Sequence, residues 1–251
     1  MEISISKDKE ELGKKAATYA AEIIKKCIDK NGKARIVLST GASQFETLQE
    51  LVQKEIDWEK VEMFHLDEYI GIPERHPASF RKYLKERFVD VVGLKKVNFV
   101  QGEGEIEKNL LNLTREIRKE PIDLGLIGIG ENAHIAFNDP PADFATTEAY
   151  IVVNLDEQCR NQQVGEGWFA SLEEVPKQAI SMTVHQILQC NVIISSVPDK
   201  RKAEAVKRTL ESEITNTIPA TKLKTHDNWS LFLDKDSASL INKLHSSNNV
   251  E

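Results

Sequence analysis

The chain has 251 residues, 40% of them hydrophobic and 29% charged, and a formal net charge of −7. This composition is typical of a folded globular protein and excludes a disordered or fibrous chain. The acidic balance and the lack of a dense Lys/Arg cluster argue against nucleic acid as a partner. The chain has no apolar run of the roughly 18–20 residues that span a bilayer and no apolar signal segment. We therefore expect no membrane association and a cytoplasmic location, where the scattered Cys27, Cys159 and Cys190 remain reduced thiols.

The hydrophobic pattern switches repeatedly between the helical period and short extended runs. Apolar residues at three-and-four spacing predict helices over residues 8–28, 45–52, 79–88, 106–117, 183–189, 203–210 and 237–244. Runs rich in β-branched residues predict strands over 34–38, 61–66, 97–100, 122–129, 150–155, 191–196 and 230–233. Residues 122–129 are apolar at nearly every position, which predicts a central strand buried on both faces.

This alternation predicts an α/β fold: a single Rossmann-like domain over residues 1–251, with a mostly parallel sheet and helices on both faces. Residues 156–180 have little periodicity and many polar groups. Because irregular segments of that length in compact domains are usually functional, we predict a lid there, with Gly165 and Gly167 as hinges. The alternative is a surface loop that packs Trp168 and Phe169 onto the domain.

Four polar segments follow predicted strands, where ligands bind in open α/β sheets: residues 39–43, 67–69, 130–134 and 198–202. Thr40, Gly41, Ala42 and Ser43 stand between a strand and a helix, where backbone N–H groups can bind an anion such as phosphate. An ordinary turn with a helix cap is the alternative. No Gly-Lys-Ser/Thr follows, so this segment is not a Walker loop.

Asp67 and Glu68 are adjacent carboxylates at a strand end, which could transfer protons, bind a metal or form a solvated turn. His65 flanks the same segment, although a packed histidine is the commoner outcome. Asp139 could orient the ring of His134 across a turn and make it a proton shuttle, whereas a lone histidine is usually structural.

Residues 128–133 match the dinucleotide fingerprint G-x-G-x-x-A, but they run into Pro140-Pro141 instead of a helix. The glycines are better explained by close approach of the backbone to a small ligand. No metal-ligand spacing unites the acidic and histidine side chains, so we do not expect a metal site.

Taken in order, these segments resemble the glucosamine-6-phosphate deaminase/isomerase family of sugar-phosphate enzymes. The similar stretches are TGAS at 40–43, FHLDEY at 64–69, HPASF at 76–80, GIGENAHIAFNDP at 128–140 and KAEAV at 202–206. The resemblance implies a cofactor-free reaction in which glucosamine 6-phosphate and water give fructose 6-phosphate and ammonia. Its partner is then a small-molecule sugar phosphate, and association into a homo-oligomer is left open.

By the same resemblance, His134 promotes ring opening, Asp139 orients it, and Asp67 moves the proton between C2 and C1. Arg160 and Lys202 correspond to the phosphate-binding cations of the family, with Lys200 as a competitor of Lys202.

The chain also departs from the family pattern. Asn132 replaces an aspartate and can only position a neighbour, because an amide cannot take up a proton. Ala133 replaces a glycine, Asp139 a glutamate and His65 an asparagine. Residues 145–150 carry no arginine, so we expect no allosteric activation by phosphate compounds.

The alternatives are a 6-phosphogluconolactonase, an isomerase of another amino-sugar phosphate, and a non-catalytic sugar-phosphate-binding protein. Asp67 favours deamination, because a lactonase needs no base at C2.

Overall fold

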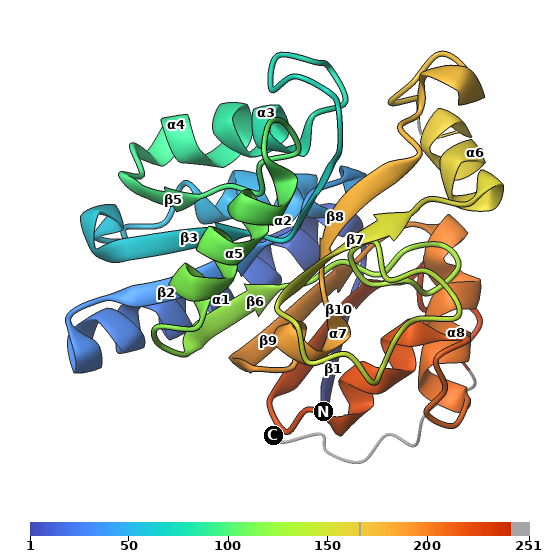
Figure 1. The fold of residues 1–251 in the computed structure, drawn as a ribbon. Helices are drawn as coiled ribbons and strands as arrows, with labels where there is room; N and C mark the ends of the chain where they lie inside the picture. Colours follow the sequence, from blue (N-terminus) through green and yellow to red (C-terminus); the bar gives the residue numbers. More distant parts are fainter. Residues whose placement is uncertain (166, 242–251) are drawn as a thin grey trace.

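A seven-stranded parallel sheet forms the centre of the protein (Figure 1). The structure is a computed structural model that describes residues 1–165 and 167–241. The strand order is β1-β10-β9-β6-β2-β3-β5, and every neighbouring pair is parallel. The strands are β1 (Glu2–Ser6), β2 (Ala34–Leu38), β3 (Val61–His65), β5 (Lys96–Asn98), β6 (Ile122–Leu126), β9 (Cys190–Val197) and β10 (Trp229–Asp234). The predicted α/β class with a parallel sheet is confirmed, and β6 lies at its centre as expected.

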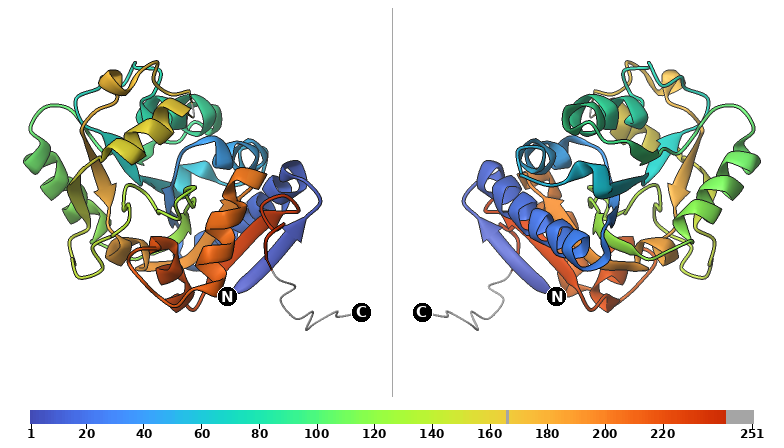
Figure 2. Two further views of the ribbon diagram at one scale, coloured as in Figure 1. Left: turned by 90° about the vertical axis from the view of Figure 1, so that its right-hand side faces the viewer. Right: turned by 90° about the vertical axis from the view of Figure 1, so that its left-hand side faces the viewer.

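Helices cover both faces of this sheet, as the alternation predicts (Figures 1 and 2). The helices are α1 (Lys9–Asn31), α2 (Phe45–Leu51), α3 (Phe80–Leu84), α4 (Asp90–Val92), α5 (Ile106–Ile117), α6 (Glu157–Gly165), α7 (Val184–Ile187) and α8 (Ala203–Glu211). Side chains of α1, α2 and α3 form one core, and side chains of α5, α7 and α8 form the other. Because side chains alternate along a strand, Ile36 and Leu38 of β2 enter the first core while Val37 enters the second.

A second, antiparallel sheet lies beside the main one, in the order β4 (Asp67–Tyr69), β8 (Gln178–Met182), β7 (Tyr150–Asn154). The extended run predicted at 150–155 is therefore a strand of this small sheet and not of the parallel one. Strands β1, β4 and β8 were not predicted, because they are short and carry polar residues at several positions.

Two expectations about irregular and helical segments were wrong. The described part of residues 156–180 is regular in much of its length: it contains α6, a 3₁₀ turn at Leu172–Glu174 and the first residues of β8. Helix α6 gave no hydrophobic period because its buried positions include Cys159 and Gln163. The helix expected over 237–244 is a turn as far as residue 241, and its remainder lies outside the described residues. Among the described helices, none combines the length and apolar character needed to cross a membrane.

The order of the strands determines where a ligand can bind. From β2 the chain proceeds through β3 to β5 in one direction, whereas from β6 it proceeds through β9 and β10 in the other. Loops leaving the carboxyl ends of β2 and β6 therefore diverge to opposite sides and leave a crevice between them, which is the position where open α/β sheets bind ligands.

Helices α1 and α2 approach closely at Gly13, and this contact generates a stability prediction. A Cβ atom at Gly13 would lie 2.5 Å from Glu46 Cβ and 2.6 Å from the Glu46 carbonyl carbon. In an open helix Gly→Ala stabilises, but here we expect Gly13→Ala to lower the free energy of unfolding by about 1–3 kcal/mol, because the helices must separate. Urea denaturation measures the change, and Lys26→Ala on the exposed face of α1 is the control. A more stable Gly13→Ala variant would contradict the packing described.

Candidate active site

Loops from four adjacent strands, β9, β6, β2 and β3, form one cleft at the carboxyl edge of the sheet. Among the described residues, its lining contains Ser39, Thr40, Gly41, Ala42, Ser43, Leu66, Asp67, Phe80, Gly128, Ile129, Gly130, His134, Ala136, Phe137, Gln162, Gln163, Trp168, Arg201 and Lys202. The structure therefore brings together the predicted phosphate loop, the predicted base, the predicted histidine and Lys202, which lie far apart in the sequence. Of the two competing lysines, Lys202 is buried at this lining and Lys200 is exposed outside it.

The predicted phosphate loop leaves β2 and enters a 3₁₀ turn (Ala42–Gln44) that leads into α2. Gly41 has a φ of +97°, a backbone conformation that side chains rarely tolerate. The buried hydroxyl of Ser39 accepts the N–H of Gly128 at 3.2 Å and so joins this loop to the loop after β6. A loop of small residues that begins a helix presents N–H groups without intrahelical partners, which suits an anion.

Asp67 is the first residue of β4, where it pairs with Ser181 of β8. Its side chain lines the cleft but is only 6% exposed. Burial, together with the neighbouring Glu68 carboxylate, raises the pKa of Asp67 well above its usual value. A carboxyl group with a raised pKa is a stronger base than an ordinary aspartate, so Asp67 is suited to removing a proton from carbon.

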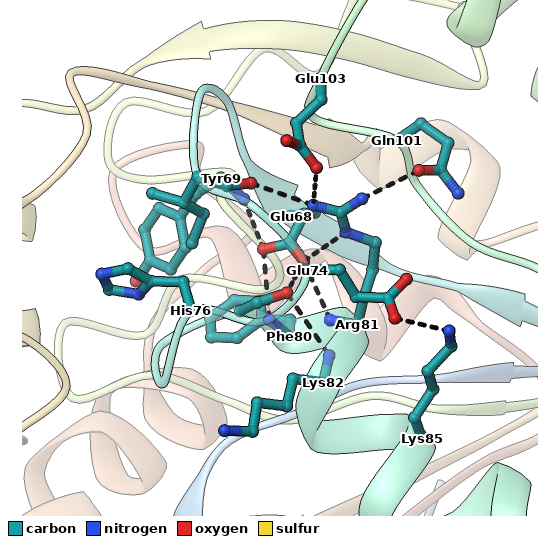
Figure 3. Close-up of polar contacts among 12 residues, drawn as sticks. Glu68, Tyr69, Glu74, His76, Phe80, Arg81, Lys82, Lys85, Gln101 and Glu103 are labelled. Carbon is teal, nitrogen blue, oxygen red and sulfur yellow. Dashed lines mark hydrogen bonds and ion pairs between the residues drawn. The ribbon is translucent and has the colours of Figure 1, made fainter.

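Glu68, the next residue along β4, binds the first turn of α3, as Figure 3 shows. Its carboxylate accepts the N–H groups of Tyr69, Phe80 and Arg81 at 2.9, 3.2 and 2.9 Å. It also accepts the Ser79 hydroxyl at 2.8 Å and Arg81 Nε at 3.2 Å. The two neighbouring carboxylates thus have different environments: Asp67 faces the cleft, and fully buried Glu68 is held by five donors.

The Arg81 guanidinium, itself buried, completes this network (Figure 3). It donates to Gln101 Oε1 at 2.9 Å, to the Ile72 carbonyl at 3.0 Å and to Glu103 at 3.0 Å. A buried ion pair is stable only when its remaining polar atoms are paired, and this one meets that condition. The network fixes the backbone immediately after Asp67.

His134, Asp139 and Asn132 form the second chemical group of the cleft. His134 Nδ1 lies 3.1 Å from Asp139 Oδ1, and the Asn132 amide donates to the same oxygen at 2.9 Å. Asn132 Oδ1 accepts the backbone N–H of His134 at 2.9 Å. Burial favours the neutral form of Asp139, but the adjacent side chains of His134, Asn132 and Cys159 outweigh it and lower the pKa of Asp139 to about 2. Asp139 therefore stays ionised beside the imidazole.

Gly128 and Gly130 leave room for protein side chains and also line the cleft, so the expectation that they let a small ligand approach the backbone stays a prediction. A Cβ atom at Gly130 would lie 2.2–2.5 Å from three atoms of the His134 ring. One at Gly128 would lie 3.2 Å from the Gln44 amide nitrogen. Ala133, which stands where the family has glycine, has a φ of +69° and is fully buried. The loop keeps the left-handed turn of a glycine at the cost of backbone strain.

Two residues singled out in the sequence lie elsewhere. Arg160 is outside the cleft lining, because its guanidinium donates to the carbonyls of Leu172 and Val175. His65 is fully buried against Phe99 instead of flanking the site, and burial lowers its pKa to about 3.

The cleft also contains a cation that the sequence reasoning did not select. Arg201 lies in the lining beside Lys202, and its only sequence signal was membership of the run Lys200-Arg201-Lys202. Gln162, Gln163 and Trp168 complete the wall from α6 and the segment after it. Buried Gln163 accepts a hydrogen bond from Tyr69 Oη at 2.6 Å, which ties this wall to β4.

The contrast between Glu68 and Glu103, which bind the same arginine, generates a second prediction. Glu68→Gln removes a buried charge and places an amide among donors, so we expect a loss of about 3–5 kcal/mol in the free energy of unfolding. Glu103→Gln removes a half-exposed partner of Arg81 and should cost less than about 1 kcal/mol. Chemical denaturation compares the two variants, and equal losses would mean that Glu68 is not the anchor.

Comparisons with known proteins show the family to which the chain belongs. The model of the family Glucosamine-6-phosphate isomerases/6-phosphogluconolactonase matches residues 7–231. A glucosamine-6-phosphate deaminase of Thermoanaerobacter sp. (strain X514) is 35% identical over 96% of this chain and 95% of its own. A deaminase of Bacillus pumilus (strain SAFR-032) is 33% identical over 96% of this chain and 100% of its own.

Solved structures extend the likeness to the fold. That of a monomeric glucosamine-6-phosphate deaminase has a TM-score of 0.88 at 29% identity and covers 96% of this chain and 100% of that one. A 6-phosphogluconolactonase from Thermotoga maritima has a TM-score of 0.78 at 16% identity over 93% of this chain and 99% of that one, which is a likeness of fold alone. With the family model covering most of its length, the chain belongs to the glucosamine-6-phosphate isomerase/6-phosphogluconolactonase family.

Proposed function

We propose that the chain is a glucosamine-6-phosphate deaminase, which converts glucosamine 6-phosphate and water into fructose 6-phosphate and ammonia. The observation that carries this proposal is Asp67, a buried carboxyl group with a raised pKa that lines the same cleft as His134 and the phosphate loop. Full-length relatives at 29–35% identity are glucosamine-6-phosphate deaminases, which supports the same activity.

Ring opening comes first and is assigned to His134. Asp139 lies at Nδ1 of the imidazole, which leaves Nε2 for the substrate. The imidazole can accept the proton of the anomeric hydroxyl and deliver one to the ring oxygen, so that the C1–O5 bond breaks and an aldehyde forms at C1. Asn132 takes no proton; it holds Asp139 and the His134 backbone in place.

Proton transfer between C2 and C1 follows and is assigned to Asp67. The carboxylate removes the proton from C2, the electrons of that bond form a C1–C2 double bond, and the aldehyde oxygen gains a proton. The acid form of Asp67 then returns the proton to C1, which regenerates the carboxylate and leaves an iminium ion at C2. Water adds to this iminium ion, and ammonia leaves as the ketone forms. One carboxyl group can serve both carbons because they are adjacent.

The phosphate end of the substrate is assigned to Thr40, Gly41, Ala42 and Ser43, together with Lys202. Backbone N–H groups at the start of a helix and a lysine at the same cleft are a common combination for phosphate.

The lid predicted at 156–180 remains a proposal, with α6 as its main element. Gln162, Gln163 and Trp168 already line the cleft, and closure of this wall would exclude water from the charged intermediate. Limited proteolysis with and without substrate tests it: equal cleavage in both samples would argue against a lid. Association into a homo-oligomer stays open, and the similar solved deaminase is monomeric.

Replacement of the proposed base gives the third prediction. We expect Asp67→Asn to abolish release of ammonia and fructose 6-phosphate, because an amide cannot accept the C2 proton. Binding of the sugar phosphate, followed as a substrate-induced rise in Tm, should stay close to that of the unmodified protein. A variant with near-normal turnover would remove Asp67 from the mechanism.

The pH dependence of the reaction gives the fourth prediction. The base must be ionised, and burial raises the pKa of Asp67, so kcat/KM should fall as the pH decreases through that raised value. The acid limb should therefore lie well above about pH 4, where an ordinary aspartate titrates. Rates of ammonia release measured across the acid range locate the limb. A profile that stays flat down to about pH 4 would contradict the environment assigned to Asp67.

A further inference from the structure

Arg201 is a charged residue of the cleft that neither the sequence motifs nor the reaction steps above account for. Among the described residues of the lining, the arginine and lysine side chains are Arg201 and Lys202. A phosphate monoester carries close to two negative charges at neutral pH, so a single lysine leaves it incompletely neutralised. We propose that Arg201 is the second phosphate-binding cation of this cleft, and that it exchanges Glu131 for the substrate phosphate. This inference rests on the proposed function.

The arginine expected from the family pattern is engaged elsewhere. Arg160 donates Nε to the Val175 carbonyl at 3.3 Å and a terminal nitrogen to the Leu172 carbonyl. These bonds hold the 3₁₀ turn that follows α6, and Val175 is buried. Moving Arg160 to a substrate would leave those carbonyls without the guanidinium, which costs free energy.

Arg201 has weaker partners than Arg160. Its Nε lies 3.6 Å from Glu131 Oε1, and Nη2 lies 4.0 Å from Asp199 Oδ2. Glu131 and Asp199 are 36% and 45% exposed, so both pairs are surface ion pairs of small net strength. A guanidinium binds phosphate through two parallel N–H donors, which is a stronger arrangement than either pair.

The backbone holds Arg201 at this position. It lies in a 3₁₀ turn (Lys200–Lys202) between β9 and α8, directly before Lys202. Asp199 precedes this turn as its N-cap; its φ is +79°, and its N–H donates to Asp234 Oδ2 at 3.0 Å. The hydrogen bond from Asp199 to Asp234, the last residue of β10, thus holds Asp199 in a backbone conformation that non-glycine residues rarely adopt. This limits how far Arg201 can move from the cleft.

Glu131, the present partner of Arg201, lies in the same loop as the proposed catalytic residue His134. It directly precedes Asn132, whose side-chain amide donates to Asp139 and whose side-chain Oδ1 accepts the backbone N–H of His134. When phosphate binds the Arg201 guanidinium, Glu131 loses its ion pair with Arg201. The negative charge of Glu131 therefore competes with phosphate, and its removal should strengthen phosphate binding.

Four variants and one probe test the proposal: Arg201→Gln, Arg160→Gln, Lys200→Gln and Glu131→Gln, with inorganic phosphate as a competitive inhibitor. We expect Arg201→Gln to raise the phosphate Ki and the KM for glucosamine 6-phosphate at least about tenfold, while kcat changes less than about threefold. Lys200→Gln removes the same charge one residue away and should change Ki less than about twofold, because exposed charges are screened. Glu131→Gln should lower Ki.

Three results would overturn the proposal: an unchanged Ki in Arg201→Gln, a larger rise in Arg160→Gln than in Arg201→Gln, or a Ki unaffected by Glu131→Gln. If the unmodified protein releases no ammonia, the proposed function fails, but the proposal about Arg201 is still decided. Isothermal titration of inorganic phosphate into the same proteins then gives the ratio of dissociation constants directly.

Discussion

The buried carboxylate of Glu68 is the interaction on which the geometry of this protein's cleft depends. It binds the N-terminal turn of α3 to β4, and β4 carries Asp67 as its first residue. Five donors converge on one charged group, so the segment from Asp67 to Arg81 has one well-determined arrangement. Asp67 can then have a raised pKa in a position with little solvent exposure, because Glu68 and not Asp67 anchors the segment.

A pair of adjacent carboxylates thus divides two tasks that oppose each other. Folding favours a carboxylate that is fully hydrogen-bonded, whereas proton abstraction favours one that is poorly solvated and has a raised pKa. The alternation of side chains along β4 turns Asp67 and Glu68 to opposite sides, so each meets the environment that its task requires. The His134 group is organised by the same principle: Asp139 stays charged within a set of donors and holds the ring that faces the cleft.

The sequence predicted the parallel sheet well, because its strands are apolar runs bounded by clear turn and helix signals. Strand β2 and helix α5 have the predicted bounds. The small antiparallel sheet was not predicted, because β4 and β8 lack a local hydrophobic pattern. Strand β4 is held instead by the hydrogen bonds of Glu68 and by pairing with β8, which is far away in the sequence.

In the candidate site, too, features set by the local sequence were predicted, whereas features set by tertiary contacts were not. The loops at the strand ends were predicted from chain order, and they do meet in one cleft. The orientation of Arg160 depends on the carbonyls of Leu172 and Val175, twelve and fifteen residues away. Gly130 is needed because the His134 ring, held by Asp139, occupies the space that a side chain at position 130 would fill. No spacing rule encodes either contact.

The three tryptophans have very different surroundings, which provides an intrinsic fluorescent probe of the cleft. Trp229 is buried in the core and donates to Ser195, and Trp58 packs edge-on against Phe88. Trp168 alone among them belongs to the lining of the cleft. A change in intrinsic fluorescence when a sugar phosphate is added would therefore originate mainly at Trp168. Occupancy of the cleft could then be followed in real time without a dye, a coupling enzyme or turnover.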